Sequence, residues 1–314
     1  MVEMLISIVV PFFNEEDNIL HFYDALCEVV AHRDESFEFL FIDDGSSDRT
    51  PLILTELAER DARVTAFILA RNFGHQTALT CGLDHARGDA VVTMDGDMQH
   101  PPTMIPDLLD KWYDGYEVVQ TVRLSTANVG AFKKWTSKLY YRFINSISQV
   151  QITEGGSDFR LIDRKVADSL LLFREKARFI RGLVSDIGYR QTQITFRAPA
   201  RYAGESKFSL RKMVRFALDG ITSYSTLPLR MALYVGVLSG IGSLLLIIYV
   251  LLIKYYFLEA VPGWATLAVM MLLFGGLQLI FLGIIGEYIG RIFAEVKDRP
   301  LYWLRGTVNQ KTRH

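Results

Sequence analysis

The stretch that decides the fold is AVVTMDGDMQH, residues 90–100. Its first five residues are apolar or β-branched, which predicts a short buried strand over residues 90–94. The chain then turns through Asp95, Gly96 and Asp97. Two carboxylates this close in a turn can approach one hard cation, Mg²⁺ or Mn²⁺, whose other ligands come from water and phosphate. Because charged turns are common, the weight of this motif depends on what surrounds it.

Segments on both sides of this stretch alternate between strand-like and helix-like patterns. Further strands are expected at residues 5–10, 37–42, 64–69 and 118–122, and helices at 18–30, 51–60 and 76–86. Alternating strands and helices predict a largely parallel sheet with helices on both faces. In such sheets ligands bind outside the carboxyl ends of the strands. The sequence therefore predicts an α/β domain whose binding site contains the turn at 95–97.

A second acidic turn, DDGSSD at residues 43–48, follows the second expected strand. Asp43 and Asp44 offer acceptors for the hydroxyl and amide groups of a nucleoside, and Gly45 permits close backbone approach. The alternative is a structural turn, in which the SSD end caps the next helix. We expect both uses, with the last aspartate the more structural one.

The first expected strand is followed by PFFNEE, residues 11–16. We expect Pro11 to end the strand, because proline lacks the N–H group that a sheet ladder needs. Asn14 and Glu15 then face the same edge of the sheet as the two acidic turns. Alone, this segment is only a strand-to-helix turn.

The C-terminal third differs in kind from the rest of the chain. Residues 232–253 and 265–286 contain no charged side chain. At 1.5 Å per residue each run is roughly 33 Å long as a helix, enough to cross a bilayer core of about 30 Å. Lysine and arginine flank the pair on the outer sides, whereas the joining loop holds only Lys254. The positive-inside rule then predicts both termini in the cytoplasm and the loop outside. The alternative is a buried helical hairpin of a soluble core.

Residues 206–231 mix basic and apolar side chains before the first apolar run. This pattern predicts amphipathic helices at a membrane surface, with an ordinary core-packing helix as the alternative. The expected organisation is an α/β domain, interfacial helices, a transmembrane hairpin and a cytoplasmic tail, at residues 1–205, 206–231, 232–290 and 291–314.

Several function classes are excluded by composition and motifs. The formal net charge of −1 gives no basic field for nucleic acid. The two cysteines, Cys27 and Cys81, form no CxxC motif, which argues against a disulfide framework or a zinc site. The chain also lacks the GxGxxG turn of a Rossmann dehydrogenase and the GxxxxGK[ST] loop of a P-loop enzyme.

Four segments in this order, VVPFFNEE, FIDDGSSD, RNFGHQTAL and MDGDMQHPP, resemble the family 2 glycosyltransferases with the GT-A fold. Four later segments, GGSDFRLIDR, RYAGESKFS, TLPLR and GEYIGRIF, are similar to the polyprenyl-phosphate branch of that family. That branch includes dolichyl-phosphate mannose synthase, the bactoprenyl glucosyltransferases and the undecaprenyl-phosphate aminoarabinose transferase. The resemblance covers essentially the whole chain. A processive polysaccharide synthase is disfavoured, because the QxxRW motif is absent.

The resemblance implies roles for individual residues. Asp95 and Asp97 would hold Mg²⁺ or Mn²⁺ with the donor diphosphate, and Asp97 would be the direct ligand. The implied nucleotide-sugar residues are Pro11, Asn14, Glu15, Asp43, Asp44 and Asp95. The implied acceptor-phosphate residues are Arg123, Arg201 and Lys207, and the implied catalytic residues are Asp97, Asp158 and Arg201.

The role of Asp158 is the least determined of these. A phosphate monoester is largely a dianion at pH 7, so the acceptor scarcely needs a general base. We therefore expect a positioning or electrostatic role first and proton abstraction second, with a structural pair to Arg160 as the alternative. His75 and His100 also lie near the strand ends, where His75 could lie close to the donor pocket and His100 could contact the metal region; because isolated histidines are more often structural, neither is assigned a role. Arg71 and Gln76 are further candidates for contact with sugar or phosphate.

The resemblance implies an inverting, metal-dependent enzyme at the cytoplasmic membrane face that transfers one sugar to a polyprenyl phosphate such as undecaprenyl phosphate. It favours glucose from UDP-glucose, with mannose, N-acetylhexosamine and aminoarabinose as alternatives. A non-catalytic membrane scaffold is the other alternative. Expected partners are a nucleotide sugar, the lipid phosphate, the bilayer and a second copy of the chain, but no nucleic acid.

Overall fold

The computed structural model describes residues 4–123, 156–176, 178, 180–196, 227–257 and 263–309. The described residues form two compact units. One contains residues 4–123, 156–196 and 299–309, and the other contains residues 227–257 and 263–298. The predicted sites at Arg201 and Lys207, and most of the predicted interfacial segment, lie outside the described residues.

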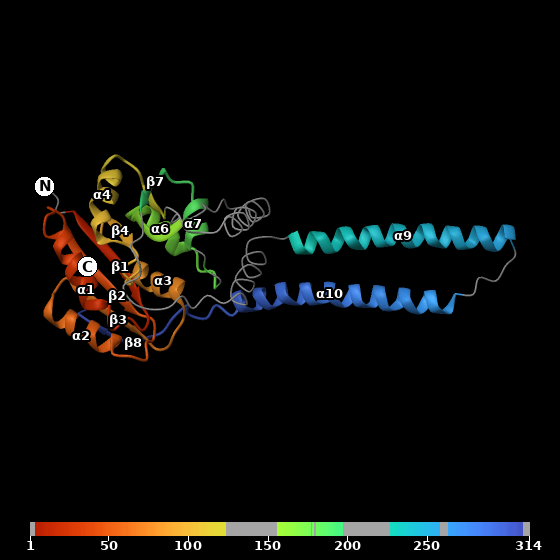
Figure 1. Ribbon diagram of the computed structural model, residues 1–314, viewed down its shortest axis with the longest axis horizontal. Helices are drawn as coiled ribbons and strands as arrows, with labels where there is room; N and C mark the ends of the chain where they lie inside the picture. Colours follow the sequence, from red (N-terminus) through yellow and green to blue (C-terminus); the bar gives the residue numbers. More distant parts are fainter. Residues whose placement is uncertain are drawn as a thin grey trace, which may run out of the picture. The chain divides into compact units, whose positions relative to one another are not determined.

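The first unit is built on one eight-stranded sheet (Figure 1). Its strands are β1 (Leu5–Phe12), β2 (Ser36–Asp43), β3 (Val64–Leu69), β4 (Ala90–Thr93), β5 (Val118–Arg123), β6 (Gly156–Asp163), β7 (Gln191–Phe196) and β8 (Leu304–Val308). The spatial order is β7-β5-β6-β4-β1-β2-β3-β8. Only β6 and β8 run against their neighbours in this sheet. The predicted fold class, a mostly parallel α/β sheet, is confirmed.

Helices cover both faces of the sheet. They are α1 (Ile19–Val30), α2 (Thr50–Arg60), α3 (His75–His85), α4 (Ile105–Tyr113), α6 (Arg164–Leu172) and α7 (Ile180–Asp186), with a 3-10 turn η1 (Pro102–Met104) before α4. One buried cluster joins α1, α2 and α4 to the sheet, and a second joins α3, α6 and α7 to it. The alternation along β1 shows why two clusters form, since Val10 lies in the first and Val9 in the second.

The sequence analysis expected strand β1 to end at Pro11, and this expectation is wrong. It continues to Phe12, and Pro11 is paired with Ile42 of β2. On the other side β4 ends at Thr93, opposite Val9. At Pro11 the sheet therefore has no strand on the β4 side, so the missing N–H group of proline breaks no ladder there.

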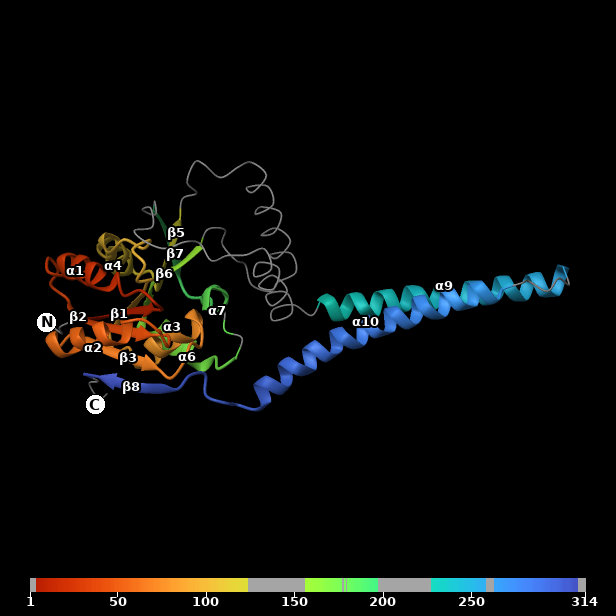
Figure 2. The ribbon, with the colours of Figure 1, turned by 60° about the horizontal axis from the view of Figure 1, so that its bottom comes forward.

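The segment expected to be a C-terminal tail contains strand β8. This strand lies beside β3 in Figure 2 and pairs antiparallel with it. The Ala70 N–H donates to the carbonyl of Trp303 at 2.8 Å. The Tyr302 hydroxyl donates to Asp84 of α3 at 2.8 Å. The chain thus returns to the sheet edge after the second apolar helix.

The second unit contains two long helices, α9 (Leu227–Phe257) and α10 (Trp264–Val296), which run side by side in Figures 1 and 2. Their candidate membrane spans are Leu227–Tyr249, with a mean hydropathy of 2.2, and Leu273–Val296, with a mean hydropathy of 1.6. Both helices are long and apolar enough to cross a membrane. Helix α10 also extends ten residues beyond the predicted end at Gly286, where Glu287 and Arg291 form an ion pair at 3.1 Å.

Candidate functional site

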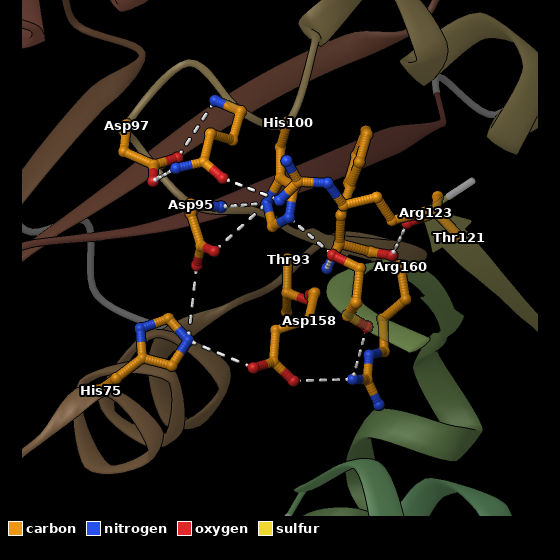
Figure 3. Close-up of polar contacts among 12 residues, drawn as sticks. His75, Thr93, Asp95, Asp97, His100, Thr121, Arg123, Asp158 and Arg160 are labelled. Atoms are coloured by element: carbon orange, nitrogen blue, oxygen red, sulfur yellow. Dashed lines mark hydrogen bonds and ion pairs between the residues drawn. The ribbon is translucent and has the colours of Figure 1, made fainter. Parts of the chain in front are cut away.

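The candidate site lies where β1, β2 and β4 end and β6 begins. Strand β6 runs antiparallel to β4, and its Arg160 pairs with Thr93, the last residue of β4. Residues that precede Arg160 in the sequence therefore lie beyond the end of β4. The Thr93 hydroxyl donates to the Asp158 carbonyl at 2.6 Å. This topology brings Asp158 beside Asp95, although 63 residues separate them in the sequence (Figure 3).

The turn after β4 requires the glycine between its two carboxylates. A Cβ at Gly96 would lie 2.2 Å from Cε1 of the buried Phe12 ring. Asp97 is held from the other side, because the Gln99 N–H donates to Oδ1 at 3.1 Å and the Gln99 side-chain amide donates to Oδ2 at 3.0 Å. Arg123 in turn donates to the Gln99 side chain at 2.9 Å. Gln99 was missed by the sequence analysis.

Asp95 presents an oxygen that suits a cation. Its Oδ1 atom is buried and accepts no hydrogen bond, and the His75 Nε2 atom lies 3.4 Å away. Among the described residues no group of three or more His, Cys, Asp or Glu side chains could hold a metal by itself. A cation at Asp95 and Asp97 would therefore complete its coordination with water and phosphate, which is the way Mg²⁺ is commonly bound.

His100 joins the turn after β4 to the start of β6. Its Nδ1 atom accepts from the Asp95 N–H at 2.9 Å, and its Nε2 atom lies 2.6 Å from the Ser157 hydroxyl. The ring is stacked on Phe159 with centroids 5.3 Å apart. Burial lowers the pKa of His100, so the neutral ring is favoured. These contacts give His100 a structural role.

Asp158 is the most heavily bonded carboxylate of the site. It accepts from Arg160 at 2.8 Å, from Arg181 of α7 at 2.9 Å on each oxygen, and from Gln76 at 3.3 Å. Burial alone would raise its pKa, but the hydrogen bond from His75 and the charges of Arg160 and Arg181 hold the pKa of Asp158 well below its usual range. Burial lowers the pKa of Arg160 to about 10, so this guanidinium stays charged at neutral pH.

Sequence reasoning did not find Arg181, and it placed His75 near the strand ends without assigning it a role. His75 lies between the two carboxylates, with Nε2 3.4 Å from Asp95 Oδ1 and 3.5 Å from Asp158 Oδ2 (Figure 3). Partial burial would lower its pKa, but the hydrogen bond to Asp158 and the charge of Asp95 raise the pKa of His75 overall. His75 lies within the RNFGHQTAL segment, whereas no local motif marks Arg181, and the fold brings both residues to Asp158.

The carboxylates of the acidic turn after β2 accept hydrogen bonds from backbone N–H groups. Asp44 accepts from the N–H groups of Phe73 at 2.8 Å and Gly74 at 3.0 Å, and Asp43 accepts from the Ser46 N–H at 3.1 Å. Burial raises the pKa of both carboxyls. Gly45 has a φ of +67°, and a Cβ there would lie 2.2 Å from the carbonyl carbon of Arg71. These two aspartates shape the walls of the site.

The turn after β1 is joined to the same loop. Asn14 adopts a φ of +54°, its N–H donates to the Ser46 hydroxyl at 2.9 Å, and its side-chain oxygen accepts from the Ser47 N–H at 2.9 Å. The Glu15 N–H donates to the Thr50 hydroxyl at 3.0 Å. The fold thus brings the predicted nucleotide-pocket segments of β1 and β2 together, and Pro11 lies within β1.

Comparison with known proteins extends over nearly the whole chain. The family model described as Glycosyl transferase family 2 matches residues 7–171. The chain is 46% identical over 297 residues to the uncharacterized glycosyltransferase YkcC of Bacillus subtilis, covering 94% of this chain and 92% of that protein. It is 40% identical over 302 residues to the SfII prophage-derived bactoprenol glucosyl transferase of Shigella flexneri, covering 96% and 98%.

Among solved structures, mannosyl-3-phosphoglycerate synthase from Rubrobacter xylanophilus aligns with a TM-score of 0.48 and 16% identity, over 69% of this chain and 72% of that one. The predicted GT-A architecture agrees with the mostly parallel sheet and the acidic turn after β4. With the family match and two relatives of 40% or greater identity over nearly the full length, the chain belongs to glycosyltransferase family 2.

Proposed function

We propose that this glycosyltransferase moves one sugar from a nucleotide-sugar donor to a polyprenyl phosphate. The observation that carries the proposal is that two acidic side chains and two arginine side chains lie close together at the strand ends. Asp95 and Asp97 offer carboxylates to a cation, while Asp158 beside them is bound by two arginines. A transfer between two phosphate-bearing substrates needs both a cation for the leaving diphosphate and arginines for the acceptor.

The acceptor class is supported by the relative in Shigella flexneri, whose name is bactoprenol glucosyl transferase. The similarity covers 96% of this chain and therefore includes both apolar helices. Glucose from UDP-glucose is the donor we propose. Mannose, N-acetylhexosamine and aminoarabinose are the alternatives that a donor panel distinguishes.

Asp95 and Asp97 would hold Mg²⁺ or Mn²⁺ together with the donor diphosphate. When bound, the cation neutralises the charge that gathers on the leaving nucleotide diphosphate. The protein fixes the two carboxylates through Gln99 and through the packing of Gly96 on Phe12. This support keeps the oxygens in one orientation during the transfer.

The acceptor phosphate acts as its own nucleophile, because its second pKa near 6 leaves it largely a dianion at pH 7. Arg123 is the described member of the proposed acceptor set, and Arg201 and Lys207 complete it by resemblance. Direct attack by the phosphate on the sugar inverts the configuration of the reacting carbon.

Helices α9 and α10 would anchor the enzyme in the cytoplasmic membrane, with the catalytic domain on the cytoplasmic side. The excess of lysine and arginine outside the pair supports this orientation. A single cysteine introduced at Glu259, in a chain without its two native cysteines, would react with an impermeant thiol reagent on intact cells. Labelling only after lysis would contradict the orientation.

The test of the function is transfer by the purified full-length protein in lipid nanodiscs. Radiolabelled UDP-glucose and a panel of other nucleotide sugars are supplied with undecaprenyl phosphate and Mg²⁺. The expected result is a lipid-linked sugar and release of nucleotide diphosphate only when lipid phosphate is present. Absence of product with every donor would favour the scaffold alternative.

A further inference from the structure

The loop between α6 and α7 exposes apolar side chains that the core does not use. Leu172, the last residue of α6, is 83% exposed, and Phe173 after it is 37% exposed. Arg174 and Lys176 follow in the same loop. A single exposed leucine is common on protein surfaces. Adjacent apolar side chains beside lysine and arginine are instead typical of a surface that lies at a membrane interface.

The segment that follows α10 lies beside this loop. Lys176 donates to the carbonyl of Arg299. Arg174 and the Tyr302 hydroxyl both donate to the carboxylate of Asp84, at 3.1 Å and 2.8 Å. These contacts join two stretches of the chain into one surface. We refer to residues 172–176 and 299–303 as the loop surface.

The covalent chain keeps the loop surface close to the membrane that α10 is proposed to cross. The candidate span in α10 ends at Val296, and Arg299 is three residues further along the chain. Three residues extend over about 11 Å at most. Trp303, in the same segment, is 60% exposed, and tryptophan is enriched at the level of the lipid headgroups. Chain length and composition therefore both favour a bilayer as the partner of this surface.

The loop surface adjoins the edge of the sheet that carries the candidate site. The Trp303 carbonyl accepts from the N–H of Ala70, which directly follows the end of β3. At the far end of the loop, the Ile180 N–H donates to the side chain of Gln76 at 3.0 Å. The Gln76 amide in turn donates to Asp158 of the site. Contact of this edge with a bilayer would hold the site near a lipid phosphate, whose prenyl tail stays in the membrane.

Charge distinguishes this surface from the opposite face of the domain. Helices α1, α2 and α4, which cover one face of the sheet, contain six Asp or Glu residues and two Lys or Arg residues. The loop surface, together with the Asp84 partner of Arg174, contains three basic residues and two acidic ones. The cytoplasmic leaflet of a membrane is negatively charged. It would therefore repel the acidic face more strongly than the loop surface.

We propose that the loop surface docks the catalytic domain on the cytoplasmic surface of the bilayer, with Leu172, Phe173 and Trp303 among the lipid headgroups. The proposal rests on the proposed function, because it takes α10 to cross the membrane. It gives the domain a second attachment to the bilayer, at the edge of the sheet where the sugar is transferred.

Spin labels on the full-length protein in nanodiscs test the position of the surface. Each label is attached to one introduced cysteine in a chain without its two native cysteines. The nanodiscs contain phosphatidylcholine and phosphatidylglycerol and one protein each. A label at Leu172→Cys should collide more often with oxygen, which concentrates in lipid, and less often with an aqueous nickel chelate, than a label at Leu52→Cys. Leu52 is the matched control, because it is 51% exposed on α2, on the other face of the sheet.

The label results separate the docking from the membrane anchor. Equal accessibility of the labels at Leu172→Cys and Leu52→Cys would overturn the proposal. Protection from nickel that requires two proteins in one nanodisc would assign the surface to a second copy of the chain and would overturn it too. A third label, at Leu244→Cys within α9, reports on the anchor. Few oxygen collisions there would contradict the proposed membrane crossing itself.

Docking should also affect the use of the acceptor. Leu172→Glu should raise the KM for undecaprenyl phosphate about 3- to 10-fold, because a charge replaces an apolar anchor at the interface. Leu52→Glu should leave this KM unchanged. The affinity for UDP with Mg²⁺, measured by calorimetry, should be the same in both variants, which also shows that they are folded.

The kinetic outcomes are equally decisive. Equal KM values for the two glutamate variants would overturn the proposal. If Leu172→Glu did not bind UDP, Leu172→Gln would decide by the same two constants. Absence of lipid-linked product from the wild type would instead contradict the proposed function.

Discussion

The two acidic turns of the catalytic domain look alike in sequence and differ in the fold. In DDG after β2, Asp43 and Asp44 are 0% and 3% exposed, and their carboxylates accept from backbone N–H groups. In DGD after β4, the Asp95 side chain is 34% exposed and its buried Oδ1 accepts no hydrogen bond. Asp97 of the same turn accepts from the N–H and the side-chain amide of Gln99, so the contrast holds for Asp95 and not for Asp97. The comparison teaches that an oxygen without a hydrogen bond, and not the sequence motif, marks Asp95 as a residue that can present an oxygen to a ligand.

The largest expected effect tests the turn after β4. Asp97→Ala should lower the rate of sugar transfer by about 10²–10⁴, because a main stabiliser of charge in the transition state is removed. Radiolabelled product formation measures the loss. Asp110→Ala is the control, since the Asp110 side chain is 66% exposed on α4 and should leave the rate unchanged. Full activity of the wild type in excess EDTA would contradict the metal role.

The next effect concerns the backbone of the turn after β2. Gly45→Ala should lower the free energy of unfolding by about 2 kcal/mol or more, because a Cβ would meet the Arg71 backbone and the positive φ is strained as well. Chemical denaturation of the full-length protein in detergent measures the change. Gly188→Ala separates the two causes, since Gly188 has a φ of +81° with nothing within 4 Å of a Cβ. Equal losses in both variants would show that the close contact contributes nothing.

A smaller effect is expected at Asp44. Asp44→Ala leaves the N–H groups of Phe73 and Gly74 without their acceptor, which should cost about 1–3 kcal/mol of stability. Asp44→Asn keeps one acceptor oxygen and should lose less. Thermal unfolding measures both variants. If Asp44→Ala were as stable as the wild type while UDP affinity fell, Asp44 would present its oxygens to the donor, and the contrast between the two turns would fail.

The smallest effect is a pH dependence at Asp43. Burial raises the pKa of Asp43 in the folded state, so the folded protein binds more protons than the unfolded protein between the two pKa values. The stability of the wild type relative to Asp43→Asn should therefore increase as the pH falls into this interval and decrease as it rises. Melting temperatures of the two proteins at pH 7 and at mildly acidic pH measure the difference. A constant difference would show that the carboxyl is not desolvated.

The sequence was sufficient to predict some strands of the domain but not others. The predicted strand at 64–69 matches β3, and the other predicted strands differ from the observed ones by one or two residues at their ends. Strands β6, β7 and β8 were not predicted. For β8 the reason is that a five-residue segment carries little periodicity and that its pairing partner β3 lies more than 200 residues earlier.

The site was predictable where each residue follows a strand end and not where a distant element supplies it. Asp95, Asp97 and Asp44 could be proposed as candidates, because they directly follow strands that the apolar runs reveal. Arg181 and the contact of His75 with Asp158 could not be proposed, because they depend on β6 pairing antiparallel with β4 and on α3 and α7 meeting at its start. Strand order is a property of the whole domain, which no local pattern encodes.

The return of β8 to the sheet has a consequence for synthesis of the protein. Ala66 pairs with Val308, and the Thr65 hydroxyl donates to the Asn309 carbonyl, so this part of the sheet joins residues from both sides of the two apolar helices. The ribosome makes β3 before the two apolar helices and β8 only after both have been synthesised. Until then β3 is an open edge, which can pair with other chains. Completion of this sheet is therefore delayed until both apolar helices have been synthesised, and a nascent chain truncated after α10 leaves that edge uncovered.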